Sequence, residues 1–228
     1  MKNKLLSVWI SALAIAMLMI LQSPIQALGQ TDAKEVLIPT DRVNLWNGED
    51  FTGWDFFSDP EKQAEASEVW RIQDGVIHCI GVPNGYMKTE AAYANYKLHV
   101  EWRWPQEPGN SGVFLHMREP DGLWPKSLEA QLWTTRAGDF VAFADVNFEE
   151  RVDMSSRVVE KMEDSAEKEA GMWNSYDIIC NGNNVTVYVN GVLMNQATSA
   201  NINSGKICLQ SEGKPIQFRN IYIEPLTD

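Results

Sequence analysis

The stretch Tyr96-Lys97-Leu98-His99-Val100-Glu101-Trp102-Arg103-Trp104 alternates between apolar and polar side chains. A period of two is typical of a β-strand that buries one face and leaves the other free. The face expected in the core carries Leu98, Val100, Trp102 and Trp104, and the opposite face carries His99, Glu101 and Arg103. The stretch therefore predicts a sheet whose second face holds groups capable of acid–base chemistry.

Three later stretches divide in the same way. The faces opposite their aliphatic side chains carry, in order, Gly112, Phe114 and His116; Glu129, Gln131 and Trp133; and Cys208, Gln210 and Glu212. If these strands are neighbours in one sheet, their polar faces form one groove with carboxylates, an imidazole, a guanidinium and indole rings. The alternative is a solvated face on which Glu101 and Arg103 form an ion pair of little energetic value. We favour a site, because a merely solvated face would carry Lys, Thr and Ser rather than His, Gln and Trp.

The rest of the chain also indicates β-structure. Short runs rich in Val, Ile, Tyr, Phe and Trp recur between Gly, Asn, Asp and Pro. The expected strands span residues 43–46, 70–73, 76–80, 86–89, 96–104, 111–117, 127–133, 139–143, 173–180, 184–189, 205–210 and 216–223. Asp74-Gly75, Asn181-Gly182 and Asn190-Gly191 accept the positive φ of tight hairpins. The pattern predicts an all-β sandwich of two antiparallel sheets, formed as a single domain by residues 43–226.

The first residues predict export. Lys2 and Lys4 precede an apolar run from Leu5 to Leu21, and Ala27-Leu28-Gly29 is a small-x-small cleavage pattern. We expect residues 1–29 to be a signal peptide and residues 30–42 an N-terminal extension. The mature protein would then be periplasmic or extracellular, with no stable membrane span. The alternative is an uncleaved anchor, because the apolar run is close to the ~18-residue length of a spanning helix.

The composition excludes one class of partner and favours another. The formal net charge is −12, from 19 Lys+Arg against 31 Asp+Glu. Because affinity for nucleic acids comes from Lys and Arg on phosphates, no nucleic acid is expected as a partner. Nine Trp are an excess in 228 residues, and a sugar face is one surface on which Trp stacks. Cys79, Cys180 and Cys208 lie in apolar runs without CxxC spacing, so we expect buried free thiols with at most one bridge.

The segment Phe148 to Met172 breaks the β pattern. It is rich in charges, and it is either an insertion loop with a short helix over one face of the sandwich or a plain solvated connection. No HxH or HExxH spacing predicts a zinc site. A divalent cation such as calcium is left open as a cofactor, since an acidic loop could bind one, although no EF-hand-like spacing marks it.

Ordered landmarks along the chain resemble a known family. They include Leu45-Trp46-Asn47-Gly48, Gly85-Tyr86-Met87-Lys88-Thr89, Gly109-Asn110-Ser111-Gly112-Val113-Phe114 and Leu209-Gln210-Ser211-Glu212-Gly213. Together they resemble the 3-keto-disaccharide (3-keto-glycoside) hydrolase domain family over about residues 43 to 226. The resemblance implies a concanavalin A-like jelly roll that cleaves glycosides already oxidised at C3 by a partner sugar oxidoreductase. It leaves hydrolysis and elimination followed by hydration open.

A C3 ketone acidifies the C2 proton, so a base can form an enolate that expels the C1 substituent. Such a site needs a base, a cation or electrophile at the C3 oxygen and an acid at the leaving oxygen. The candidates are His116 or Glu129 as base, Arg103 or a bound cation at the enolate, and Glu101 as acid or as the partner of Arg103. The expected sugar-binding residues are Gln131, Trp133, Lys88, Gln210 and Glu212. The rival function is a non-catalytic carbohydrate-binding module, since jelly rolls also bind glycans through Trp rings.

Overall fold

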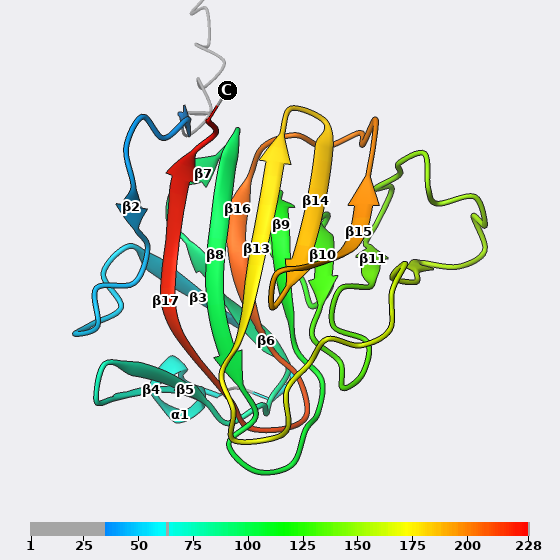
Figure 1. Cartoon of the computed structure of the whole chain (residues 1–228). Coiled ribbons are helices and arrows are strands. Elements are labelled where there is room, and N and C mark those ends of the chain that lie inside the picture. The colour runs from blue at the N-terminus through cyan, green and yellow to red at the C-terminus, as the bar shows by residue number, and fades with distance from the viewer. Residues whose placement is uncertain (1–34, 63, 228) are drawn as a thin grey trace, which may run out of the picture. The chain divides into compact units, whose positions relative to one another are not determined.

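The computed structural model describes residues 35–62 and 64–227 (Figure 1). Two antiparallel sheets pack face to face as a jelly-roll β-sandwich, which confirms the predicted fold class. The predicted signal peptide, residues 1–29, lies outside the described residues. Among the described residues, none forms a helix long and apolar enough to span a bilayer.

The first sheet has seven strands. In spatial order they are β12 (Val158–Val159), β11 (Phe140–Ala142), β10 (Leu128–Gln131), β9 (Gly112–Met117), β16 (Lys206–Ser211), β6 (Gly85–Thr89) and β3 (Trp54–Ser58). Their inward side chains enter the core between the sheets, and the outer face of this sheet carries a second apolar cluster around Tyr86, Phe114 and Phe143.

The second sheet covers the other side of the core (Figure 1). Its strands are β15 (Val192–Ala197), β14 (Asn184–Val189), β13 (Asn174–Asn181), β8 (Tyr96–Arg103), β17 (Ile216–Pro225), β5 (Val76–Cys79) and β4 (Trp70–Gln73), with β2 (Val43–Asn44) beside β17. The remaining elements are the helix α1 (Ala66–Val69) and the parallel pair β1 (Val36–Leu37) and β7 (Ala92–Tyr93). Val36 and Leu37, within the predicted N-terminal extension, thus pair with the sandwich.

The alternation along β8 is as predicted. Leu98, Val100 and Trp102 are fully buried, while the residues between them are only partly covered. Tyr176 of β13 extends the same core and links the sheets, since its hydroxyl donates to the Gln131 carbonyl of β10 and accepts from the Gly138 amide at 2.8 Å. Because β13 and β10 belong to different sheets, this hydrogen bond fixes the position of β10 relative to the opposite sheet.

Two of the three predicted turn dipeptides and the cysteines follow expectation, whereas at Asn181-Gly182 only Gly182 has a positive φ, 55°. Asp74 and Gly75 have φ values of 53° and 74°, and Asn190 and Gly191 have 49° and 82°, as tight hairpins require. Cys79, Cys180 and Cys208 are all buried and free. The prediction of buried thiols is therefore confirmed.

The segment Phe148 to Met172 contains no helix. Val158 and Val159 pair with Val141 and Phe140, which adds a short edge strand to the seven-stranded sheet. The segment is therefore neither a loop with a short helix nor a plain solvated connection, because part of it forms a strand of the seven-stranded sheet.

The predicted direction of His116 is wrong, because a bulge reverses the alternation of β9 at that point. Leu115 and His116 lie opposite the single residue Ile207, and His116 has a φ of 55°. The His116 ring consequently packs edge-on against Tyr96 in the core, at 5.8 Å between ring centroids. It is fully buried, and neither ring nitrogen has a hydrogen-bond partner among the described residues.

Burial of His116 makes the fold sensitive to acid. Burial, helped by the charge of Arg118, lowers the pKa of His116 from 6.5 to about 4. Between about pH 6.5 and pH 4 only the unfolded chain binds this proton, so the free energy of unfolding should fall with pH by up to about 3 kcal/mol. Urea unfolding across this range should show a shallower slope in His116→Gln. His78→Gln, which removes a partly exposed imidazole, should keep most of the slope. A His116→Gln slope equal to wild type would contradict the assignment.

Candidate functional site

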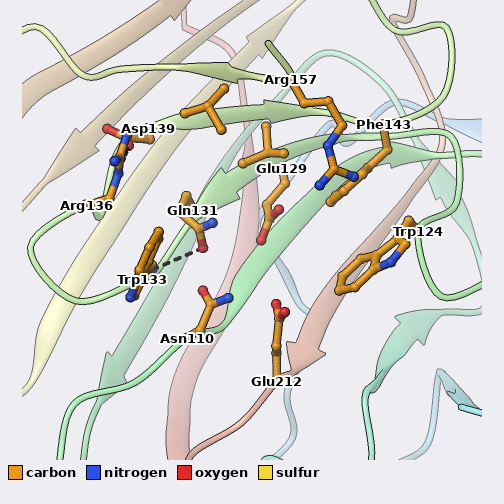
Figure 2. A pocket seen from close by; sticks show the side chains of 12 residues that line it. Asn110, Trp124, Glu129, Gln131, Trp133, Arg136, Asp139, Phe143, Arg157 and Glu212 are labelled. Atoms are coloured by element: carbon orange, nitrogen blue, oxygen red, sulfur yellow. Dashed lines mark hydrogen bonds and ion pairs between the residues drawn. The ribbon is translucent and has the colours of Figure 1, made fainter. Parts of the chain in front are cut away.

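A cavity of about 230 Å³ opens on the outer face of the seven-stranded sheet (Figure 2). Glu129 and Gln131 of β10 form its floor. The remaining walls come from the turn after β10, the connection between β9 and β10, the segment before β12 and the end of β16. Pockets for drug-sized ligands are typically about 300–1,000 Å³, so this cavity suits a smaller molecule such as one sugar unit.

Glu129 occupies the centre of the cavity floor. It lies opposite Phe114 on β9 and Val141 on β11, and its side chain crosses over Gly112, where a Cβ atom would overlap the carboxylate. Glycine at 112 is therefore what allows the carboxyl group to lie flat on the sheet. The group is almost fully buried, and its Oε1 has no hydrogen-bond partner among the described residues.

A second carboxyl group, Glu212, faces Glu129 across the cavity (Figure 2). It follows β16 and forms an isolated bridge with Asn110, which precedes β9. Burial and the charge of Glu212 raise the pKa of Glu129 well above its usual value, against the opposing charge of Arg157. Burial also raises the pKa of Glu212, against Gln210 and Arg157. Since each negative charge disfavours the other, the two groups favour a state that holds one proton.

Arg157 is one of two arginines that line the cavity, and the other, Arg136, forms an ion pair with Asp139. Arg157 precedes β12 in the charged segment, and its guanidinium lies 5.4 Å from the centre of the Phe143 ring. Figure 2 shows it reaching toward Glu129 from the wall opposite Glu212. A guanidinium in this position stabilises negative charge that forms between it and the carboxyl groups.

Two tryptophans flank the carboxyl groups (Figure 2). Trp133 is 50% exposed and follows β10, and its backbone amide donates to Gln131 Oε1 at 3.1 Å. Trp124 is 39% exposed on the opposite wall and stacks on Phe143, with 5.4 Å between ring centroids. Half-exposed indole rings on either side of a polar floor are suited to the apolar faces of a sugar. Asn110 adds a buried Oδ1 without a hydrogen-bond partner among the described residues.

The family model described as 3-keto-alpha-glucoside-1,2-lyase-like domain matches residues 41–224. The chain belongs to this family. Membership places it among carbohydrate-active proteins. A search of the curated proteins gives no match.

Solved structures share the concanavalin A-like fold. A putative glycosyl hydrolase from Parabacteroides distasonis is 24% identical over 82% of this chain and 94% of that one, with a TM-score of 0.59. The β-glucanase of Bacillus licheniformis is 14% identical over 81% and 97%, with a TM-score of 0.51. The carbohydrate-binding module CBM66 of Bacillus subtilis is 11% identical over 76% and 96%, with a TM-score of 0.55. At these identities the likeness shows the fold alone.

Four of the predicted site residues meet in the cavity of this family member. They are Glu129, Gln131, Trp133 and Glu212, which come from the outward positions of β10, the turn after it and the end of β16. Gln210 lies on the same outer face but is buried and does not line the cavity. Lys88 is also on this face, but it does not line the cavity. Its ammonium group forms ion pairs with Asp121 at 2.5 Å and Glu119 at 3.2 Å.

The expectation that Glu101 and Arg103 share this groove is wrong. Their strand, β8, pairs with β13 and β17 in the other sheet, so its outward face lies on the far side of the sandwich. There Glu101 accepts hydrogen bonds from Arg219 at 2.6 Å and Asn220 at 2.8 Å. Arg103 donates to Gln217 and lies over the Trp173 ring. His116, turned into the core by its bulge, does not reach the cavity either.

The sequence reasoning missed Asn110, Trp124, Arg136, Asp139 and Arg157. Asn110 stands within a family landmark and could have been chosen from it. Asp139 is buried and accepts from Arg136 at 2.6 Å, which holds the turn that presents Trp133. Arg157 carries no local signal, because only the pairing of β12 with β11 brings it to the site. Within residues 35–62 and 64–227 no three His, Cys, Asp or Glu side chains are grouped to hold a metal ion.

Glu129→Gln should stabilise the protein at neutral pH. The folded protein keeps the Glu129 proton above the ordinary pKa of 4.5, whereas the unfolded chain loses it, so the raised pKa lowers stability as pH rises. A neutral amide removes this cost. At pH 8 we expect a melting temperature about 2 °C or more above wild type, the effect of about 1 kcal/mol in a domain of this size.

The gain should shrink as the pH approaches 4.5, and thermal melts at pH 4.5, 6 and 8 measure it. Glu163→Gln, at an exposed position of the charged segment, is the matched control and should show no such trend. A Glu129→Gln variant less stable than wild type at pH 8 would show that the carboxylate is a structural group.

Proposed function

We propose that this protein cleaves the glycosidic bond of 3-keto-glycosides by removing the C2 proton and expelling the C1 substituent. The family membership supports the substrate class, and the cavity offers the groups that the reaction needs. The observation that carries the proposal is the pair Glu129 and Glu212. These two enclosed carboxyl groups lie near Arg157, and their negative charges repel each other, so the pair favours a state with one proton.

The two environments suggest which carboxyl group is the base and which is the acid. Glu129 is the more deeply buried and has the more strongly raised pKa, so it keeps the shared proton. Glu212 is closer to solvent and ionises first, and burial still raises its pKa above the usual value, which suits a general base. This reverses the expectation that Glu129 is the base.

The electron balance of the step is simple. The base takes the C2 proton, and the electrons of the C2–H bond form an enolate whose charge rests on the C3 oxygen. Arg157 stabilises that oxygen. The enolate then collapses, the C1–O bond breaks, and the leaving oxygen takes the proton of Glu129. The product is an enone with a C1=C2 double bond and a free aglycone. Conjugate addition of water, with the hydroxyl at C1 and the proton at C2, gives the same products as hydrolysis.

The sugar would lie between the two tryptophans. Trp133 and Trp124 offer rings to its faces, while Asn110 and Gln131 offer amide groups to its hydroxyls. This arrangement fixes C2 and C1 above the carboxyl groups, and positioning of this kind supplies much of the rate gain in a reaction without a covalent intermediate.

The test compares a 3-keto-glucoside with its parent glucoside. We expect aglycone release only from the keto sugar, slowed by deuterium at C2, because the proposed step breaks the C2–H bond. Glu212→Gln should lower kcat by about 10²–10⁴-fold, the usual contribution of a general base. Glu129→Gln should do so for an alkyl aglycone but much less for a nitrophenyl aglycone, which leaves without an acid.

Other outcomes would point elsewhere. Release from both sugars at equal rates would contradict dependence on the ketone. Tight binding of the sugars without turnover would instead identify a carbohydrate-binding module. Turnover of the keto sugar without a deuterium effect would favour direct hydrolysis over elimination.

Gly112→Ala provides an independent test of the Glu129 position. The added methyl group would overlap the Glu129 carboxylate, which must move, while the backbone at 112 does not have positive φ. Misplacement of a catalytic group by about 1 Å can cost about 10²-fold, so we expect kcat to fall by roughly this factor in a folded protein. Gly122→Ala, whose Cβ would meet open space, is the control and should retain activity. Wild-type kcat in Gly112→Ala would rule Glu129 out as a catalytic residue.

A further inference from the structure

The wall that carries Trp124 is a strap, residues 118–126, which joins β9 to β10 across the outer face. Its base is closed by a hydrogen bond from the Arg118 amide to the Lys126 carbonyl, 2.9 Å long. It contains no strand or helix, so its shape depends on what its side chains bind. Beneath it lies the apolar cluster of Tyr86, Phe114, Met117 and Cys208.

Two buried polar side chains of the sheet bind exposed carboxylates of the strap and fasten the strap to the sheet. Lys88 of β6 is only 5% exposed, and its ammonium group contacts Asp121 Oδ2 at 2.5 Å and Glu119 Oε1 at 3.2 Å. Tyr86, on the same strand, donates its hydroxyl to Asp121 Oδ1 at 2.8 Å and accepts from the Gly122 amide at 3.4 Å. Asp121 therefore receives one donor on each carboxylate oxygen.

This arrangement costs more than a surface ion pair would, because a lysine is desolvated to make it. The two contacts with Asp121 and Gly122 come immediately before Leu123 and Trp124 in the chain. On the other side of Trp124, Lys126 reaches the exposed Asp145 at 2.9 Å and its carbonyl closes the base of the strap, while the Ser127 hydroxyl donates to the Pro125 carbonyl of the same segment. The contacts on the Asp121 side are thus the ones that join the strap to fully buried or nearly buried side chains of the sheet.

We propose that Lys88 and Tyr86 are positioning residues that act through Asp121 to hold Trp124 at the wall of the sugar cavity. Lys88 touches no substrate in this view, in contrast to the sugar-binding role predicted for it. The consequence for binding rests on the proposed function, but the position of Trp124 does not.

The position is measured first, in the full chain labelled with 5-fluorotryptophan. Its nine resonances include one assigned to Trp124 by Trp124→Phe. Lys88→Met should shift or broaden that resonance and leave the Trp133 resonance unchanged. Lys206→Met is the matched control, because Lys206 is also buried on the same face but pairs with Asp55 at 3.7 Å and Glu119 at 3.6 Å, and within the described residues it forms no ion pair with Asp121. It should leave Trp124 unchanged.

Kinetics on a 3-keto-glucoside then test the consequence. Lys88→Met should raise KM roughly two- to tenfold, as expected when one contact side chain must be ordered on binding, with kcat within about twofold. In a Trp124→Ala background the same substitution should cause no further change in KM, because it acts only by changing the position of the Trp124 ring, which that background lacks. A general loss of structure would instead add to the Trp124→Ala defect.

If Lys88→Met does not fold, Tyr86→Phe replaces it. This variant keeps the ring stacked on Phe57 and removes only the hydroxyl between Asp121 and Gly122, so it should move the Trp124 resonance in the same direction. An unchanged Trp124 resonance in a folded Lys88→Met or Tyr86→Phe protein would overturn the proposal. Additive kinetic defects would do the same. If the Trp124 resonance shifts but the protein does not cleave keto sugars, the positioning role of Lys88 and Tyr86 is supported and the proposed function is contradicted.

Discussion

The whole arrangement depends on the division of the seven-stranded sheet into one face that packs against the other sheet and one that does not. Burial of Leu128 and Ala130 against the core forces Glu129 and Gln131 outward, because successive side chains of a strand point to opposite faces. The Tyr176 hydroxyl, bonded to the Gln131 carbonyl, fixes this strand from below. The site therefore inherits its rigidity from the core, and its floor cannot move without disturbing the sandwich.

The outer face is not an ordinary solvated surface. Aromatic side chains, the strap and the edge strand β12 cover it in part, so that two carboxyl groups are placed where water cannot fully stabilise their charges. Burying two carboxyl groups in this way lowers the free energy of unfolding. Proteins keep such costly groups mainly at sites where the groups perform chemistry. One side-chain oxygen each of Glu129 and Asn110 is buried without a hydrogen-bond partner among the described residues. Because buried polar atoms normally have partners, these two oxygens also indicate a binding site. A ligand with hydroxyl groups would satisfy them.

Alternation in the sequence was enough to predict most of the strands, the sandwich and the outward direction of Glu129, Gln131 and Trp133. It failed at three points for different physical reasons. A period of two cannot reveal a bulge, and one extra residue in β9 turned His116 from the outer face to the core. Alternation also does not say which sheet a strand joins, so Glu101 and Arg103 looked like neighbours of Glu129 although β8 pairs elsewhere. Trp54–Ser58 was missed because adjacent phenylalanines break the period, although it forms the edge strand β3.

Arg157 shows a fourth limit, and it bears on how members of one family could differ in substrate. Its segment breaks the β pattern of the sequence, yet β12 pairs with β11 at the edge of the sheet and so brings a guanidinium to the carboxyl pair. An edge strand has one free side, so residues can be inserted beyond it without displacing the strands that hold Glu129. The floor of the cavity is therefore constrained by the core, whereas the Arg157 wall and the Trp124 strap are connections that can change independently. Differences in the aglycone accepted by related chains should accordingly follow these two walls, and the carboxyl pair should stay where the sheet places it.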